Sequence, residues 1–205
     1  ADGRRSDDGA RTRGRASAPH VRTARTEDAV GDIDLHLYLS TNRDQSGVLV
    51  VRERASMREL ARLHALGRGS RGVGDTQMQV NGNTPVGTYR VKRLKSTAGW
   101  STTSYGPNGA LELEPVAGLA KDAEQLVGRS GLLIHGGSRG APGYWRGQGQ
   151  LRATQGCVRL SDADMQRLTT LLGEAQEDLA RAQSTAIEVT LTVAEFPASI
   201  AAPPL

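Results

Sequence analysis

The chain has 205 residues, which is long enough for one domain with a well-buried core. Apolar residues make up 37% and aromatic residues 3% of it, so the core must be aliphatic, and no apolar run reaches the roughly 18 residues of a membrane span. The formal net charge is +4, but the most Arg-rich stretch is nearly neutral, because residues 1–32 hold seven Arg beside six Asp or Glu. The chain lacks the basic stripe with interleaved aromatics that indicates nucleic-acid binding.

The two ends of the chain differ in composition from the rest. Residues 1–32 have few large apolar side chains, which predicts a disordered or linker-like leader. They contain no signal-peptide core, so a role outside the cytoplasm implies a processed, truncated or otherwise exported form. Residues 197–205 form a Pro-containing tail that we expect to fray. The expected folded domain therefore spans residues 33–196.

The first half of this domain begins with two strand signals. Residues 33–39 alternate apolar and polar side chains, and residues 48–51 are a short apolar run. Residues 56–66 are predicted to be a helix, because Ser56 and Glu59 have the spacing of a capping box and leucines recur at every third position.

A glycine-rich string follows at residues 67–72 and formally matches G-x-G-x-x-G. It follows a predicted helix rather than a strand, and no helix begins on it, so we interpret it as a turn and not as a dinucleotide site. The histidines upstream, His36 and His64, are expected to face solvent without a catalytic role.

The middle of the chain contains further alternating segments. Residues 76–80, 87–94 and 110–115 are predicted strands, and residues 121–128 a short helix. Residues 131–135 form a dense apolar strand that ends on a histidine followed by two glycines.

The last predicted elements follow a glycine-rich loop. Ser161 is placed to cap a helix with Met165, Leu168 and Leu172 on one face, and residues 186–193 alternate as a final strand. Strands outnumber helices and mostly follow one another directly. This order indicates a mostly β, largely antiparallel fold with small helices.

The single cysteine, Cys157, is either a small buried hydrophobic residue or a reactive thiol, and it excludes an intramolecular disulfide. His135 ends a strand and could act as its base, since an imidazolium can lower a thiol pKa from about 8.5 to roughly 3.5–7.5. Gly156 would let a substrate approach the backbone, whose N–H groups could form an oxyanion hole.

These motifs together resemble the catalytic domain of L,D-transpeptidases over residues 76–172. The family has His-Gly at a strand end, a loop, and then Ser/Thr-His-Gly-Cys-aliphatic-Arg; this chain has His135-Gly136 and then Thr154-Gln155-Gly156-Cys157-Val158-Arg159. Residues 83–91 also resemble the TP-x-G segment of the family. One departure is Gln155, which stands where the family has a second histidine and cannot carry a proton.

The resemblance implies a β-sandwich with small helices and a site that needs neither metal nor cofactor. Cys157 would be the nucleophile, His135 the base, and the Gly136 carbonyl would orient the imidazole. The remaining implied roles are loop or oxyanion support for Thr154, Gln155 and Gly156, stem-peptide binding or loop orientation for Arg159, and a lid or a loop anchor for Tyr144 and Trp145.

The implied reaction is acyl transfer on peptidoglycan stem peptides in the cell envelope, either in the periplasm or after secretion. Cys157 would release a terminal D-alanine and form a thioester, which a second stem amine converts into a cross-link. Two alternatives stay open: an L,D-carboxypeptidase or secreted wall-targeting effector that trims stems with water, and a non-catalytic wall-binding module. The sequence indicates no oligomeric state.

Overall fold

The computed structural model describes residues 32–71, 76–137, 151–181 and 189–196. The predictions for the leader, the tail, Tyr144 and Trp145 lie outside these residues. Among the described helices, none is long and apolar enough to cross a membrane.

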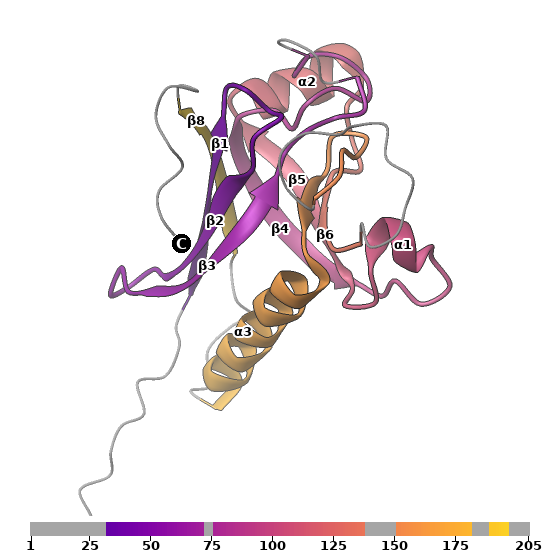
Figure 1. Ribbon diagram of the computed structural model, residues 1–205. Helices are drawn as coiled ribbons and strands as arrows, with labels where there is room; N and C mark the ends of the chain where they lie inside the picture. Colours follow the sequence, from indigo (N-terminus) through magenta and orange to yellow (C-terminus); the bar gives the residue numbers. More distant parts are fainter. Residues whose placement is uncertain (1–31, 72–75, 138–150, 182–188, 197–205) are drawn as a thin grey trace, which may run out of the picture.

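The described strands form one closed barrel in the order β1-β2-β3-β7-β6-β5-β4-β8 (Figure 1). The mostly β prediction is confirmed, with the strands joined in a ring because β8 pairs with both β1 and β4. The strands are β1 (Ile33–Ser40), β2 (Gly47–Glu53), β3 (Glu59–Leu66), β4 (Gly87–Lys95), β5 (Ala110–Ala117), β6 (Leu133–His135), β7 (Val158–Leu160) and β8 (Thr190–Phe196). The helices are α1 (Thr102–Tyr105), α2 (Leu119–Val127) and α3 (Asp162–Arg181).

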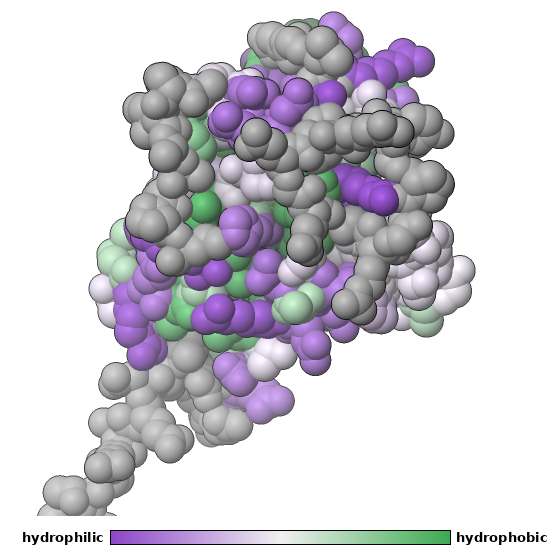
Figure 2. Space-filling model, in the orientation of Figure 1, coloured by the Kyte–Doolittle hydropathy of each residue, from purple (hydrophilic) through white to green (hydrophobic). Residues whose placement is uncertain are grey.

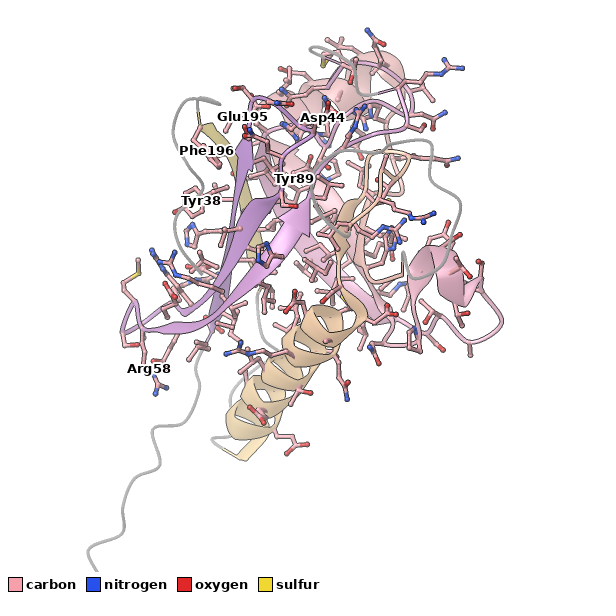
Figure 3. The ribbon with its side chains drawn as sticks, viewed as in Figure 1. Tyr38, Asp44, Arg58, Tyr89, Glu195 and Phe196 are labelled. Carbon is pink, nitrogen blue, oxygen red and sulfur yellow. The ribbon has the colours of Figure 1, made fainter. Side chains whose placement is uncertain are left out.

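The barrel interior is the hydrophobic core. Along β1, alternate leucines from Leu35 to Leu39 are fully buried, as the period of two in a strand requires. Each such side chain contributes about 1.5–3 kcal/mol relative to an exposed one. Tyr89 lies between the strands in Figure 3, and its hydroxyl donates a 2.7 Å hydrogen bond to the Pro85 carbonyl. Figure 2, drawn in the orientation of Figure 1, shows that hydrophilic residues cover much of the described surface on the face toward the viewer.

Two strand pairs in the barrel are parallel, namely β1 with β8 and β6 with β7. Parallel neighbours need a long connection, so each pair joins segments that are distant in the sequence. The β6–β7 pair brings the segment that ends on His135 next to the segment that begins after Cys157.

The predicted helix at 56–66 is wrong, because β3 occupies Glu59–Leu66 and pairs with both β2 and β7. Its residues in the hydrophobic core cluster alternate from Ala61 through Leu63 to Ala65, which is the period of a strand. Ser56 does not cap a helix: its Oγ accepts from the Arg58 N–H in a turn. The glycine-rich string therefore follows a strand. Of its described part, Ser70 and Arg71 lie in a turn, whereas Gly69 forms an isolated parallel bridge with Thr154.

The predicted strand at 76–80 is also wrong, since this segment is a series of turns. The Gln79 N–H donates to the Thr76 carbonyl and the Gly82 N–H donates to the Gln79 carbonyl, so the backbone bonds locally and not to a neighbouring strand. The short helix α1 was not predicted. The cap at Ser161 is confirmed, because its Oγ accepts a 3.0 Å hydrogen bond from the N–H of Asp164.

Candidate active site

Strands β6 and β7 place the two candidate catalytic side chains on one wall. Their register pairs Ile134 with Val158 and His135 with Arg159. Paired residues share a face and faces alternate along a strand, so fully buried Ile134 and Val158 point into the core, and His135 and Arg159 point the other way. Cys157, one residue before Val158, lies on the same side as His135. All three polar residues line a cavity of about 700 Å³.

The His135 ring is held from two sides. Its Nδ1 lies 2.8 Å from the Gly136 carbonyl oxygen, which can only accept, so the neutral ring carries its proton on Nδ1. The Tyr105 ring of α1 packs against it with centroids 5.0 Å apart. This arrangement leaves Nε2 as the proton acceptor.

Burial sets the protonation state of His135, a residue that is only 3% exposed. Desolvation first, and then the charge of Arg159, lower the pKa of His135 to about 4, against a smaller raising effect of the Gly136 hydrogen bond. The imidazole is therefore neutral at pH 7 and able to accept a proton.

Cys157 is partly exposed to the cavity. Burial raises the pKa of its thiol, while a hydrogen bond from the Leu133 backbone and the charges of Arg159 and Arg129 act in the lowering direction. The resting cavity is therefore lined by a thiol and a neutral imidazole, in place of the thiolate–imidazolium pair considered from the sequence.

Arg159 connects the site to the surrounding backbone. Its Nη1 donates 2.6 Å hydrogen bonds to the carbonyls of Gly136 and Ser104, so it fixes the same carbonyl that orients His135. Asp162 at the start of α3 accepts from the Gly137 N–H at 2.6 Å and holds the end of β6 from the other side. These contacts fit the loop-orienting role of Arg159.

The loop before Cys157 is held by hydroxyl groups. Thr154 Oγ1 accepts from the Gly156 N–H at 3.0 Å and donates to the Cys157 carbonyl at 2.8 Å. Thr84, from the TP-x-G segment, donates a 2.9 Å hydrogen bond to the Gly156 carbonyl. The Gly156 N–H is thus engaged in the loop and is not a free oxyanion donor. Gln155 is exposed at the cavity wall.

Arg129 is a cavity residue that the sequence reasoning missed. It follows the left-handed Gly128 at the end of α2 and is 5% exposed. Its guanidinium donates to the carbonyls of Asn83 at 2.7 Å and Gly82 at 3.1 Å, and also to that of Gln77. A Cβ on residue 156 would lie 2.0 Å from Arg129 Nη2, so only glycine fits there, where φ is +107°. No local sequence pattern announces this contact.

Tyr144 and Trp145 lie outside the described residues, so their relation to the cavity stays a prediction. No group of three or more His, Cys, Asp or Glu that could hold a metal ion occurs within the described ranges.

Comparison with known proteins identifies the family. The model of the L,D-transpeptidase catalytic domain (YkuD) matches residues 42–178. The chain belongs to this family. L,D-transpeptidase domains are acyltransferases that act on peptidoglycan stem peptides outside the cytoplasm. Comparison with the curated proteins finds no match.

Two solved structures are similar to this L,D-transpeptidase domain. Bd1075 of Bdellovibrio bacteriovorus has 15% sequence identity, with 78% of this chain and 47% of that chain covered and a TM-score of 0.49. An L,D-transpeptidase from Xylanimonas cellulosilytica has 17% identity, with 82% and 62% covered and a TM-score of 0.34. The chain thus spans between about half and three fifths of the lengths of these proteins.

Proposed function

We propose that this chain is a peptidoglycan L,D-transpeptidase that forms a thioester at Cys157 and works in the cell envelope, in the periplasm or after secretion. One observation carries the proposal: His135 at the end of β6 and Cys157 just before the paired strand β7 line one cavity, with Nε2 of a neutral imidazole available as a base. Membership of the L,D-transpeptidase catalytic domain family supports the reaction class.

In the first half of the reaction, His135 Nε2 takes the thiol proton as Cys157 Sγ attacks the carbonyl carbon before the terminal D-alanine of a stem peptide. The C–N bond then breaks. The leaving amine of D-alanine takes the proton from the imidazolium, and the remaining stem is held as a thioester on Sγ. Proton transfer and attack proceed together, because burial disfavours both the thiolate and the imidazolium.

In the second half, the amine of another stem attacks the thioester carbonyl. His135 Nε2 accepts the proton of that amine and returns it to the departing sulfur, so that thiol and neutral imidazole are restored. The new amide bond is the cross-link. Gln155 cannot carry a proton in either half, so His135 performs each transfer.

The supporting residues act on orientation. The Gly136 carbonyl holds the His135 tautomer, and Arg159 holds that carbonyl through its 2.6 Å hydrogen bond. Thr154 fixes the turn that presents Cys157, through its bonds to the Gly156 N–H and the Cys157 carbonyl. Rigid placement of this kind is what lowers the barrier when two groups must meet in one geometry.

Product analysis tests the proposal. Purified protein is incubated with disaccharide tetrapeptides, and the products are separated and weighed by mass spectrometry. We expect cross-linked dimers and free D-alanine, with both lost in Cys157→Ala while the circular dichroism spectrum is unchanged. Tripeptides without dimers would show that the enzyme trims stems with water and does not cross-link them. Turnover that survives in Cys157→Ala would contradict the assignment of the nucleophile.

A further inference from the structure

The cavity beside Cys157 carries charge of one sign. The charged side chains that line it are Arg71, Arg129 and Arg159, and none of the described residues in its wall is Asp or Glu. The other polar groups in the wall are hydroxyls, amides and the neutral His135 ring. A cavity with this lining attracts anions and disfavours cations.

The two buried arginines have no carboxylate partner among the described residues. Arg159 is 6% exposed and donates to the carbonyls of Ser104 and Gly136, and Arg129 donates only to backbone carbonyls as well. Asp162 acts electrostatically on Arg159, but its Oδ1 accepts the Gly137 N–H. Carbonyl dipoles neutralise a buried guanidinium less completely than a carboxylate does, so both sites gain from an incoming anion.

Arg159 also retains an unused donor. Its Nε is buried without a hydrogen-bond partner among the described residues. A buried N–H in this state loses its hydration without compensation, and a carboxylate is a much stronger acceptor for a guanidinium than a neutral amide. Arg71 differs in being exposed, so it can meet a ligand without prior rearrangement.

We propose, on the basis of the function proposed above, that this cavity selects donor stem peptides by their free side-branch carboxylates. A stem with free carboxylates at its second and third residues would place negative charge along the arginine-lined wall while its scissile carbonyl reaches Cys157. Amidation of these carboxylates replaces each anion by a neutral group and removes that attraction. The preferred donor is therefore the free-acid stem, and the amidated stem is a poor one.

Binding to an inactive variant tests this selection apart from turnover. Cys157→Ala is titrated in a calorimeter with L-Ala-γ-D-Glu-meso-diaminopimelyl-D-Ala and with the same peptide amidated at both side-branch carboxylates. The terminal D-alanine carboxylate is present in both probes. We expect the free acid to bind at least about tenfold more tightly, the effect of one lost charge-assisted hydrogen bond.

Two further variants in the Cys157→Ala background locate the effect. Arg71→Gln should reduce the preference for the free acid severalfold, whereas Arg167→Gln, the same change at an exposed site of α3 outside the cavity, should leave it unchanged. Equal affinity for the two peptides, absence of binding by both, or an identical effect of the two arginine substitutions would overturn the selection. If the wild-type protein cross-links neither peptide although the free acid binds preferentially, the proposed function would be contradicted and the selection would not.

Discussion

His135 shows how a single buried side chain combines stability and chemistry. Its pKa of about 4 results mainly from burial, which includes packing against the Tyr105 ring. The positive charge of Arg159 lowers the pKa further. The same burial that makes it a neutral base at pH 7 imposes a cost when the ring must become charged. The consequence is a pH dependence of folding that can be assigned to one residue.

We predict that acid destabilises the wild-type protein more than His135→Gln. The unfolded ring titrates near 6.5 and the folded ring near 4, so the unfolded state binds more protons between these values. The contribution is fully present above pH 6.5 and is lost as the pH falls towards 4. Its full size is about 3 kcal/mol, from 2.5 pKa units at about 1.36 kcal/mol each.

Urea denaturation at pH 7 and at pH 4 measures this difference. His64→Gln, at an exposed position on β3, is the matched control for loss of a histidine. The stability gap between wild type and His135→Gln should narrow on acidification. An unchanged gap would show that His135 is not held neutral by the fold.

At the scale of elements, the site depends on contacts between segments that are far apart in the sequence. The turns at 76–84 pack under the cysteine loop: Thr84 donates to the Gly156 carbonyl, and Arg129 binds the carbonyls of these turns. The TP-x-G segment thus acts as a support for the cysteine loop as well as leading into β4.

We predict that Thr84→Val impairs turnover and stability together. Thr84 is fully buried, and the substitution removes the hydroxyl that donates to the Gly156 carbonyl. We expect this to lower the free energy of unfolding by about 1–3 kcal/mol. Thr84→Ser keeps the hydroxyl and serves as the control. Cross-linking rates and urea midpoints of both variants provide the measurement, and equal behaviour of Val and Ser at this position would contradict the supporting role of the bond.

The elements that the sequence predicted correctly have one dominant period. Strands such as β1 and β5 alternate cleanly, and α3 has both a cap and an apolar face. At 56–66 the leucines fit a spacing of three while alternate positions fit a strand, and pairing with β2 and β7 decides for the strand. Local periodicity contains no information about such partners.

The candidate site also combines residues that local sequence identifies with residues that only the folded chain reveals. His135 and Cys157 could be selected from sequence because each stands in a short motif at a strand end. Arg129 could not, because its importance comes from the close approach of Gly156, which only the folded chain creates. The neutral state of the pair is likewise a consequence of burial that no motif encodes.

For the molecule as a whole, β1 and β8 close the barrel although both lie outside the part matched by the family model. β8 pairs in parallel with β1 and antiparallel with β4. Glu195, labelled near the end of β8 in Figure 3, forms an ion pair with the buried Arg43. Arg43 also donates to the Thr84 carbonyl at 3.1 Å. Closure of the barrel is thereby linked to the support of the site.

We predict that a chain ending at residue 188 loses cooperative thermal unfolding, whereas one ending at residue 196 retains it. Without β8, the edges of β1 and β4 lose their shared partner, and Leu191 and Val193 no longer fill the core. Differential scanning calorimetry compares the two chains. A similar melting temperature for both would show that the barrel does not depend on β8.

In the proposed mechanism, a stem peptide acylates Cys157 and His135 drives this step. Mass spectrometry of the protein after brief exposure to disaccharide tetrapeptide, followed by peptide mapping, measures it directly. We expect an adduct on Cys157 whose mass equals that of the disaccharide tetrapeptide less D-alanine, and we expect it to form much more slowly in His135→Gln. An adduct elsewhere, or cross-linked product without any acylated Cys157, would contradict it.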